Sequence, residues 1–491
     1  MVEVSGDSLA LPEIYSVAHL GDEVQLGSGV RDKMIRSRET VDDIIEGGRV
    51  VYGVNTGFGK LSDITIPHSE LAALQLNLVR SHACGVGEPL SEPEVRAMLL
   101  LRANVLAKGF SGARYVVAET LVEMLNKGVT PHIPCRGSVG ASGDLAPLAH
   151  LALAVIGEGK AYYEGELLPG GEAMQRAGIA PITLAAKEGL ALLNGTQAMV
   201  AVGGLALFQA QALWDRANVA GAMTLEALKG TPAAFDARIH EVRPHQGQQL
   251  CAQSLLELLA GSEIRESHLE NDPRVQDAYC LRCMPQVHGA TYDAIRFAAD
   301  VLEVESGSAT DNPLVFDNGD VISGGNFHGA PVAQALDFAA IALTDMAAMS
   351  ERRVDRLLNP DSNEGLPAFL APKPGTSSGF MIAHVTPAAL LTECKVLSHP
   401  ASVDTIPTSA GKEDHVSMGM TSALKLRQIV LNVGHILAIE LMCAAQGLES
   451  RRPLRAGVGV EEAYAEVRRL VPALGEDRVL SDDIERLARM H

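Results

Sequence analysis

One stretch of the chain, residues 137–150, reads Gly-Ser-Val-Gly-Ala-Ser-Gly-Asp-Leu-Ala-Pro-Leu-Ala-His. It follows the breaker-rich segment 131–136, Pro-His-Ile-Pro-Cys-Arg. Turn chemistry accounts for one or two of the glycines, because glycine adopts positive φ angles at little cost. It accounts less well for Ala141-Ser142-Gly143, which stands between two segments that look ordered. The stretch therefore predicts a constrained loop that leads into a helix over residues 145–157.

Two interpretations of Ala141-Ser142-Gly143 are open from these residues alone. In the first, the Gly143 nitrogen attacks the Ala141 carbonyl carbon with loss of one water, and the serine side chain then loses a second. The product is a methylidene imidazolone ring, an electrophile made from backbone. In the second, the residues form a helix N-terminus, with Ser142 or Asp144 as the cap and an anion site above it. The tripeptide by itself favours the second interpretation.

The composition indicates a soluble globular protein with an aliphatic core. The 491 residues suffice for two or three domains or one large helical assembly. Lys and Arg number 40 against 60 Asp and Glu, and the resulting formal charge of −20 argues against binding to nucleic acid or to an anionic membrane surface. A single Trp and many Ala and Leu residues favour helices with aliphatic contacts.

The sequence carries no sign of secretion, and we expect a cytoplasmic protein. The first residues, Met-Val-Glu-Val-Ser-Gly-Asp, are acidic where a signal peptide is basic. The seven cysteines are odd in number and scattered, which is typical of reduced thiols. Polar residues interrupt the apolar segments near 184–214 and 426–448, so these are predicted to be buried helices and not membrane spans. The pair Cys280 and Cys283 has no second pair or histidine at zinc spacing, so no metal site is expected.

The periodicity of apolar residues predicts a mainly all-α protein. A capped helix is expected from Thr40 to Gly47-Gly48, followed by a short extended run over 49–52 and a glycine-rich loop over 53–59. A small hairpin is expected over 160–168. The other predicted helices are 71–80, 91–127 with a break near 109–112, 184–229, 247–260, 286–304, 329–357, 382–397, 415–447 and a charged tail from about 460. Several of these exceed the usual helix length, which is typical of a bundle of long central helices.

Unusual polar residues gather in the loops between these helices, where functional groups are often held. Tyr52 stands before the glycine-rich loop, and alone it is best explained as a half-buried tyrosine bonded to backbone. His82 precedes a Gly-Val-Gly loop and could be a locally satisfied histidine. Asn194 forms an Asn-Gly pair inside a predicted helix, which costs helix stability and suggests a kink or a contact.

Segment 272–282 offers an amide, a phenol and a guanidinium together, from Gln276, Tyr279 and Arg282. Arg282 could bind a carboxylate with two hydrogen bonds, or could pair with one of the many acidic residues. Phe327 and Glu413 stand in two further polar segments, 324–328 and 411–415. A nucleotide-binding glycine motif, a phosphate-binding loop, a zinc-protease motif and a serine-hydrolase elbow are all missing from the sequence.

Together these segments resemble the aromatic amino-acid ammonia-lyases, and among them the members that act on histidine. The resemblance runs from about residue 10 to 450 with the motifs in order, and this order makes it far more specific than any single motif. The matching segments are 52–59, 81–87, 137–150, 193–197, 275–283, 323–328, 377–382 and 413–418. It favours the ring-forming interpretation of Ala141-Ser142-Gly143.

The resemblance implies a long central helix bundle of the aspartase/fumarase-like type with a smaller N-terminal domain bearing loops and short strands. We expect the N-terminal domain, with the Ala-Ser-Gly loop, to cover residues 1–200. The bundle domain and a C-terminal helical tail would then cover residues 201–491. The resemblance also implies a homotetramer in which each active site takes loops from three subunits.

The activity implied is the elimination of ammonia from L-histidine to give trans-urocanate, the first step of histidine degradation. The prosthetic group would be 4-methylidene-imidazol-5-one (MIO), formed from Ala141-Ser142-Gly143 without metal or nucleotide. The electrophile would take up the substrate either at its amine or at its ring. Tyr52 matches the residue proposed as base for the β-proton, which a phenol can be at neutral pH only if its pKa is lowered.

The resemblance also assigns roles in binding. Arg282 would hold the substrate carboxylate, and His82 and Glu413 would address the imidazole and the amine. Tyr279, Asn194, Gln276 and Phe327 would line the prosthetic ring and support the substrate.

Glu413 favours histidine over a phenyl substrate, because a buried carboxylate finds a donor on an imidazole and none on a phenyl ring. Members of the family that act on histidine commonly carry Asn-Gln before the Glu-Asp-His motif. This chain has Gly411-Lys412 there, so the charge near Glu413 differs.

Two alternatives stay open. A protein of the same fold could be a tyrosine ammonia-lyase or an aromatic amino-acid 2,3-aminomutase. A protein of a different class would be a catalytically silent helical binding protein with an unmodified Ala-Ser-Gly.

Overall fold

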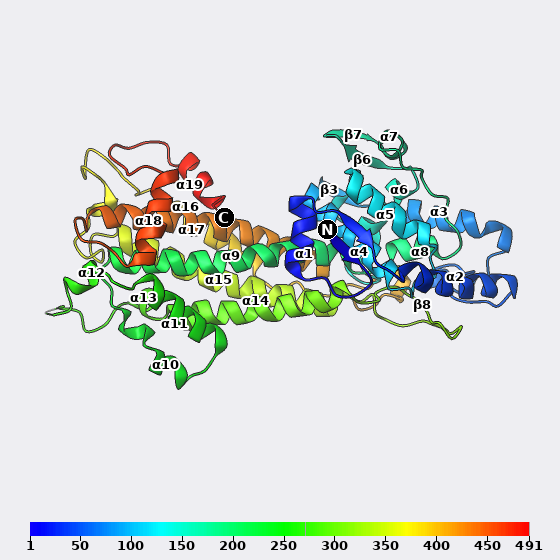
Figure 1. Ribbon diagram of the computed structural model, residues 1–491, viewed down its shortest axis with the longest axis horizontal. Helices are drawn as coiled ribbons and strands as arrows, with labels where there is room; N and C mark the ends of the chain where they lie inside the picture. Colours follow the sequence, from blue (N-terminus) through cyan, green and yellow to red (C-terminus); the bar gives the residue numbers. More distant parts are fainter. Residues whose placement is uncertain (271, 491) are drawn as a thin grey trace. The chain divides into compact units, whose positions relative to one another are not determined.

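The computed structural model describes residues 1–270 and 272–490 and is mainly helical (Figure 1). Helices hold 58% of the residues and strands 7%, so the expectation of an all-α protein with long central helices is confirmed. The strands are short, and within the described part of the chain they form three two-stranded sheets and one three-stranded sheet.

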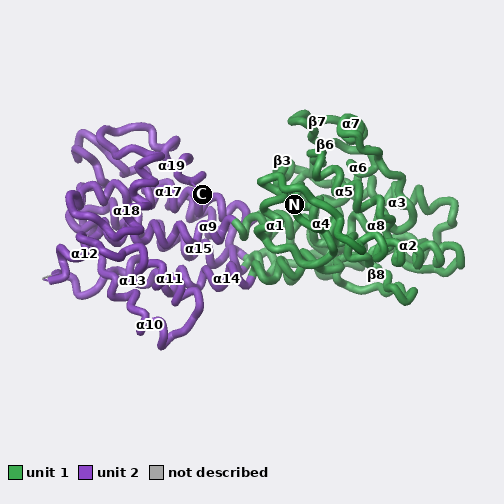
Figure 2. Tube along the Cα trace, in the orientation of Figure 1, with its two compact units in different colours: residues 1–208, 298–337, 400–424 green, residues 209–297, 338–399, 425–491 purple. Residues whose placement is uncertain are grey.

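The chain divides into two compact units (Figure 2). Unit 1 comprises residues 1–208, 298–337 and 400–424, and unit 2 comprises residues 209–297, 338–399 and 425–491. The segments 298–337 and 400–424 therefore belong to unit 1, although they follow the end of the expected N-terminal domain at residue 200. The division into domains at residue 200 stays a prediction.

Four long helices contribute residues to both units: α9 (Gln197–Ala227), α14 (Met284–Ser306), α15 (Ala330–Leu358) and α17 (Gly419–Glu449). Two of them, α15 and α17, are long and apolar enough by composition to cross a membrane. In α17, 83% of the most apolar window is buried inside the protein, and in α15 the share is 61%. They are core helices, and the interpretation of 426–448 as a buried helix is confirmed.

Unit 1 holds the shorter helices of the first half of the chain and all of the strands. Its helices are α1 (Leu11–Tyr15), α2 (Val30–Glu46), α3 (Leu71–His82), α4 (Glu92–Ala107), α5 (Tyr115–Lys127), α6 (Leu145–Val155), α7 (Gly170–Arg176) and α8 (Glu188–Leu193), with a π-helical turn at Ser16–Leu20 and 3₁₀ turns at Gly59–Leu61, His68–Glu70 and Ser409–Gly411. Its strands are β1 (Val2–Val4), β2 (Val24–Leu26), β3 (Val86–Pro89), β4 (Thr130–Pro131), β5 (Pro134–Arg136), β6 (Lys160–Tyr163), β7 (Glu166–Pro169), β8 (Leu314–Val315) and β9 (Val321–Ile322).

Unit 2 is built from helices alone among the described residues. These are α10 (Ala237–Glu241), α11 (Gln246–Leu258), α12 (Glu263–Glu266), α13 (Tyr279–Arg282), α16 (Val385–Leu397), α18 (Val458–Leu470) and α19 (Ser481–Ala488), with 3₁₀ turns at Pro232–Phe235 and Ala368–Leu370.

Several local predictions are confirmed and others are wrong. The break near 109–112 separates α4 from α5, and the hairpin is β6–β7 with a turn at Glu164-Gly165. The helix expected from Thr40 begins ten residues earlier, at Val30, so the Thr40 hydroxyl bonds back to the Arg36 carbonyl and caps nothing. Residues 49–52 form no strand. The predicted helix 184–229 is interrupted at 194–196, between α8 and α9.

A buried ion pair joins three of the long helices within unit 2. The Arg353 guanidinium of α15 contacts the Glu440 carboxylate of α17 at 2.5 Å, and both side chains are fully buried. The hydroxyls of Thr224 in α9 and Ser350 in α15 donate to the same carboxylate. Since a buried charge is costly without full pairing, this network fixes which faces of the helices meet.

Glu226 in α9 makes the stability of the protein depend on pH. Burial raises the pKa of this carboxyl to about 7, although hydrogen bonds from Ser262 Oγ and Gly457 N oppose the rise. A carboxyl whose folded pKa lies above its ordinary value favours the folded state most at acid pH, and it loses that contribution as the pH rises through 7.

Glutamine at this position does not ionise, so Glu226→Gln should lose less stability than wild type when the pH rises. The difference in unfolding temperature, Glu226→Gln minus wild type, should therefore increase by roughly 2–4 °C from pH 5 to pH 8.5. The measurement is thermal unfolding followed by circular dichroism at both pH values, with the exposed Glu257→Gln as the control. A constant difference between Glu226→Gln and wild type across this range would contradict the assignment.

Candidate active site

The Ala-Ser-Gly loop connects β5 to α6, and its backbone is sharply turned. Gly140 and Gly143 have φ angles of +64° and +72°, which favour glycine. A Cβ atom on Gly143 would lie 2.2 Å from the Gly195 carbonyl oxygen, and one on Gly140 would lie 2.2 Å from the Ser417 hydroxyl. Both positions therefore require glycine for the conformation and for the space.

The interpretation of this loop as a capped helix N-terminus places Asp144 correctly but is wrong about its side-chain contact. Asp144 stands at the N-cap position of α6, but no side-chain hydrogen bond caps that helix. The Asp144 carboxylate instead accepts from the backbone N–H of Met199, in the first turn of α9, and from the Ser138 hydroxyl, both at 2.8 Å. Burial raises the pKa of Asp144 to about 6, and these hydrogen bonds limit the rise.

The break between α8 and α9 holds the loop on one side. The Asn194 amide donates to the Ser142 carbonyl oxygen at 2.8 Å, and the Asp144 N–H donates to the Gly195 carbonyl oxygen at 2.7 Å. The cost of Asn194-Gly195 inside a helical region is therefore explained by these two contacts with the loop.

The segment before α17 holds the loop on the other side. The Ser417 hydroxyl donates to the Gly140 carbonyl oxygen at 2.8 Å, and the Met418 N–H donates to the Val139 carbonyl oxygen at 2.8 Å. Ala141 packs with Val416 and Met418 in a small buried apolar cluster. The tripeptide is thus fixed from two directions.

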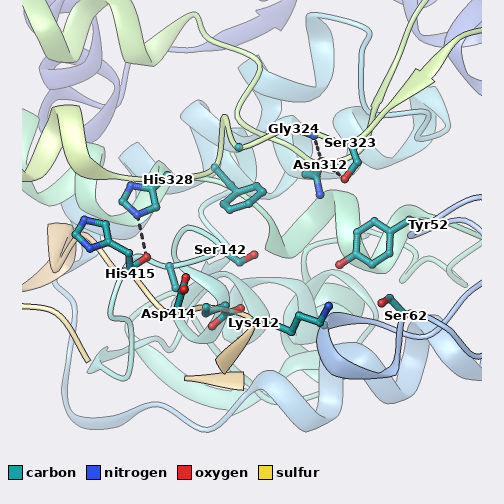
Figure 3. Close-up of a pocket in the computed structure, with 15 residues that line it drawn as sticks. Tyr52, Ser62, Ser142, Asn312, Ser323, Gly324, His328, Lys412, Asp414 and His415 are labelled. Carbon is teal, nitrogen blue, oxygen red and sulfur yellow. Dashed lines mark hydrogen bonds between the residues drawn. The ribbon is translucent and has the colours of Figure 1, made fainter. Parts of the chain in front are cut away.

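A cavity of about 510 Å³ opens beside this tripeptide, within unit 1. Figure 3 shows Ser142 near its middle, with Tyr52 on one side and His328 and His415 on the other. Five of the residues expected in the site line it: Tyr52, Ala141, Ser142, Phe327 and Glu413. The other lining residues are Gly59, Ser62, Asn312, Ser323, Gly324, Gly325, His328, Lys412, Asp414 and His415.

The Tyr52 phenol is protonated at neutral pH in this setting. Its pKa lies above the ordinary value because it is half-buried and because the Glu413 carboxylate faces it, while a hydrogen bond from the Gly59 backbone acts in the opposite direction. Lys412 is the one lysine or arginine among the lining residues of the described chain. A base role for Tyr52 therefore needs further positive charge in the cavity.

Glu413 is half-buried and is oriented by its neighbours. The Thr408 hydroxyl donates to its carboxylate at 2.7 Å, and the two residues are also paired through their backbones. Glu413 lines the cavity, and no hydrogen bond of its second carboxylate oxygen with another described residue is seen. Glu413 can therefore accept a hydrogen bond from a bound molecule.

His82 lies at the end of α3 and does not line the cavity. Its ring nitrogen Nδ1 bonds to the Leu78 carbonyl oxygen at 2.8 Å. The segment after it forms β3, which pairs with β5, and β5 leads into the Ala-Ser-Gly loop. Gly85 N–H donates to Nε2 of His150, in the helix that follows the loop. His82 is thus tied to the same substructure, and its contact with a substrate stays a prediction.

The remaining three expected residues lie in unit 2 and line a different cavity, of about 540 Å³. There the Arg282 guanidinium donates to the Gln276 amide oxygen and lies 4.8 Å from the centre of the Tyr279 ring. Tyr279 is 71% exposed. The expected site residues thus form two groups, one around Ser142 and one around Arg282.

Several cavity residues were not expected from the sequence. Asn312 is buried at the end of the segment before β8, and its amide oxygen accepts from the Gly324 N–H at 2.7 Å and from the Ser323 hydroxyl. No motif marks Asn312 or Ser62. His328 and His415 do belong to recognised segments, and the His328 ring bonds to the His415 carbonyl oxygen at 3.1 Å. The described residues contain no group of three or more His, Cys, Asp or Glu that could hold a metal ion.

Comparison with known proteins places this geometry in a family. The family model described as aromatic amino acid lyase matches residues 9–469. The chain is 55% identical to the histidine ammonia-lyase of Koribacter versatilis (strain Ellin345), over 98% of this chain and 96% of that protein.

Two solved structures extend the match to the fold. The structure of histidine ammonia-lyase from Trypanosoma cruzi is 44% identical with a TM-score of 0.92, covering 99% of this chain and 92% of that one. The tyrosine aminomutase from Streptomyces globisporus is 38% identical with a TM-score of 0.94, covering 99% and 96%. The match of sequence and fold over nearly the whole length leaves one assignment: the chain belongs to the aromatic amino acid lyase family.

Proposed function

We propose that this protein is a carbon–nitrogen lyase that eliminates ammonia from L-histidine and releases trans-urocanate. The observation that carries the proposal is the cavity in which Ser142 of the fixed Ala-Ser-Gly loop meets Tyr52 and Glu413. The similarity to curated histidine ammonia-lyases over nearly the whole chain supports the choice of substrate.

We propose further that Ala141-Ser142-Gly143 becomes the MIO group. The residues around the tripeptide fit such a group: Gly143 admits no side chain, and the buried Oδ1 atom of Asn194 has no hydrogen-bond partner among the described residues. A buried acceptor without a hydrogen-bond donor is costly, and it is explained if the tripeptide gains a different structure after the ring forms. The group would supply an electrophile that withdraws electrons from the bound substrate.

The protein's own residues would then bind and orient the substrate. Glu413 would accept a hydrogen bond from the imidazole N–H or the ammonium group, and Phe327 would cover the substrate ring. Asn194 would hold the carbonyl of Ser142 in place through its amide. Tyr52 would take the β-proton once positive charge in the filled cavity lowers the pKa of its phenol.

The division of the expected residues between two cavities supports a homotetramer with shared sites. In this proposal Arg282, Tyr279 and Gln276 of one subunit complete the cavity around Ser142 of another, where the Arg282 guanidinium binds the substrate carboxylate and adds positive charge. His82 would reach the substrate in the same assembly. Location in the cytoplasm, and the lack of nucleic-acid and membrane partners, remain part of the proposal.

A second candidate is a tyrosine ammonia-lyase or an aromatic amino-acid 2,3-aminomutase. The observation that favours it is the TM-score of 0.94 with a tyrosine aminomutase. Against it stands the 55% and 56% identity to two curated histidine ammonia-lyases over nearly the whole chain. Glu413 adds an argument against a phenyl substrate alone, because a phenyl ring offers its carboxylate no hydrogen-bond donor, whereas a tyrosine hydroxyl offers one.

Incubation of the purified protein with L-histidine, L-tyrosine and L-phenylalanine in turn separates these candidates. The appearance of the unsaturated acid is followed by absorbance, and the intact mass of the chain is measured in parallel. We expect turnover of histidine at least ~100-fold above that of phenylalanine, because a site built to hydrogen-bond a polar ring rejects a ring without the donor. We expect histidine also to be preferred over tyrosine, in line with the similarity to histidine ammonia-lyases. Preferred turnover of tyrosine would show that Glu413 is not the selecting group. A mass equal to the encoded chain with no turnover would favour the silent binding protein.

A further inference from the structure

A buried arginine stands behind the Ala-Ser-Gly loop. Arg102 of α4 is 0% exposed, and its guanidinium donates to backbone carbonyl oxygens: Nη1 to Ala191 at 3.0 Å, and both Nη1 and Nη2 to Asn194 at 2.9 Å. Within the described residues it makes no direct contact with a carboxylate. Asp311 and Asp144 act on it only from a distance, and burial lowers its pKa to about 10.

This arrangement is costly for a residue with a purely structural role. Carbonyl groups at a helix end can be satisfied by a backbone turn or by an exposed side chain. Burying a guanidinium without a directly paired carboxylate carries a larger cost, because the charge loses its hydration without gaining an opposite charge. The cost is understandable if the position of the Asn194 carbonyl must be held more firmly than a turn would hold it.

One of the two residues that Arg102 bonds, Asn194, contacts the tripeptide, and Gly195 follows it directly in the chain. Asn194 donates from its side chain to the Ser142 carbonyl oxygen, and Gly195 accepts from the N–H of Asp144. A Cβ atom on Gly195 would lie 2.7 Å from Nη2 of Arg102, so the segment and the guanidinium are packed directly together. Displacing the guanidinium would therefore move both contacts with the loop.

We infer that Arg102 is a positioning residue for the conversion of Ala141-Ser142-Gly143 into the prosthetic ring. This inference rests on the proposed function, in which that ring forms. In the conversion a bond forms between the Gly143 nitrogen and the Ala141 carbonyl carbon. The Ala141 oxygen leaves as water with the hydrogens of the Gly143 and Ser142 nitrogens, and the Ser142 hydroxyl leaves as a second water with the Cα hydrogen. No oxidant or reductant is consumed.

Arg102 contributes to this step only by positioning the backbone groups that react. The bond requires the Gly143 nitrogen to approach the Ala141 carbon, which an extended backbone prevents. The hydrogen bonds from Asn194 and to Gly195 fix the peptide units on both sides of Gly143, and Arg102 fixes the segment that makes them. Because misplacement by about 1 Å can slow a reaction on the order of a hundred-fold, the loss of this support should be visible as slow ring formation.

The experiment measures the intact mass of the full chain against time. Wild type, Arg102→Met and Arg102→Lys are produced by cell-free synthesis. Samples are quenched at intervals, and the mass of each chain is measured by mass spectrometry. The control is Arg96→Met, because Arg96 lies on the same helix and also donates to backbone carbonyl oxygens, those of Val17 and Leu125, which lie outside the loop.

We expect wild type and Arg96→Met to lose two waters at the same rate, and Arg102→Met to lose them on the order of a hundred-fold more slowly. Arg102→Lys should be intermediate, since lysine keeps the buried cation but cannot make the forked contact. Circular dichroism and thermal unfolding show whether each variant is folded. If Arg102→Met fails to fold, the rate of water loss in Arg102→Lys is the test of the inference.

Three results would contradict the proposed function or the inference about Arg102, and the measurements distinguish them. A wild-type chain that keeps its encoded mass overturns the proposed function and the inference with it. A wild type that loses two waters, together with folded Arg102 variants that lose them equally fast, overturns the inference alone. Slow ring formation in Arg96→Met as well as in the Arg102 variants would show a general effect of helix α4 and would also overturn it.

Discussion

Replacing Ser142 by alanine is expected to lower the turnover of L-histidine by roughly a thousand-fold or more while leaving the fold intact. Alanine carries no hydroxyl to lose, so the chain cannot make the methylidene group and the cavity keeps no electrophile. The Ser142 side chain is only partly buried, and no hydrogen bond of its hydroxyl with another described residue is seen, so its removal should cost little stability. The measurement combines urocanate formation, intact mass and thermal unfolding.

The matched control for this substitution is Ser422→Ala. Ser422 is buried in α17, its hydroxyl has no hydrogen-bond partner among the described residues, and it lies outside the cavity. We expect Ser422→Ala to keep the mass of the modified chain and the wild-type turnover. Full activity of Ser142→Ala would contradict the proposed chemistry, because no other residue could supply the methylene carbon.

Two inactive variants should restore activity when they are combined in one oligomer. Tyr52→Phe removes the candidate base from the cavity of unit 1, and Arg282→Met removes the candidate carboxylate ligand from the cavity of unit 2. Each variant alone should lose most of its activity. If each site takes Tyr52 from one subunit and Arg282 from another, random mixing at equal amounts leaves about a quarter of the sites with both native residues.

Coexpression of the two variants with different affinity tags, followed by purification of the mixed oligomer, provides the test. The recovered activity is compared with that of each single variant and with the double variant expressed alone. Recovery near a quarter of the wild-type value supports sites shared between subunits. Activity no higher than that of the single variants would show that both residues of a site come from one chain.

Much of the fold could be predicted from the sequence because its long helices carry a strong apolar period. The hairpin at 160–168 was also accessible, since a glycine turn stands between two alternating segments. The start of α2 could not be predicted, because Thr40 followed by Asp43 resembles a capping box although both lie inside a continuous helix. The pairing of β3 with β5 joins strands of four and three residues that lie far apart in sequence, and no local pattern predicts such contacts.

The residues of the candidate site could be predicted from the sequence only in part. The motif around Ser142 and the residues Tyr52, Phe327 and Glu413 could be gathered from their resemblance to one family, and the structure places them around one cavity. Asn312 could not, because a single asparagine after a long helix carries no motif, and only its hydrogen bonds with 323–324 reveal its place. The capping role of Asp144 toward α9 escaped for the same reason, since the two segments are 55 residues apart.

The contacts that hold the Ala-Ser-Gly loop and the side chains that line the cavity come largely from different segments. The loop is held by residues 194–195 and 417–418, through two side chains and two main-chain groups, whereas much of the cavity wall comes from 323–328 and 412–415. If the tripeptide forms the proposed ring, substitutions in the wall are therefore expected to leave the contacts that support its formation in place. We therefore expect that the wall can be varied broadly, to accept other amino acids, in chains that still form the proposed ring.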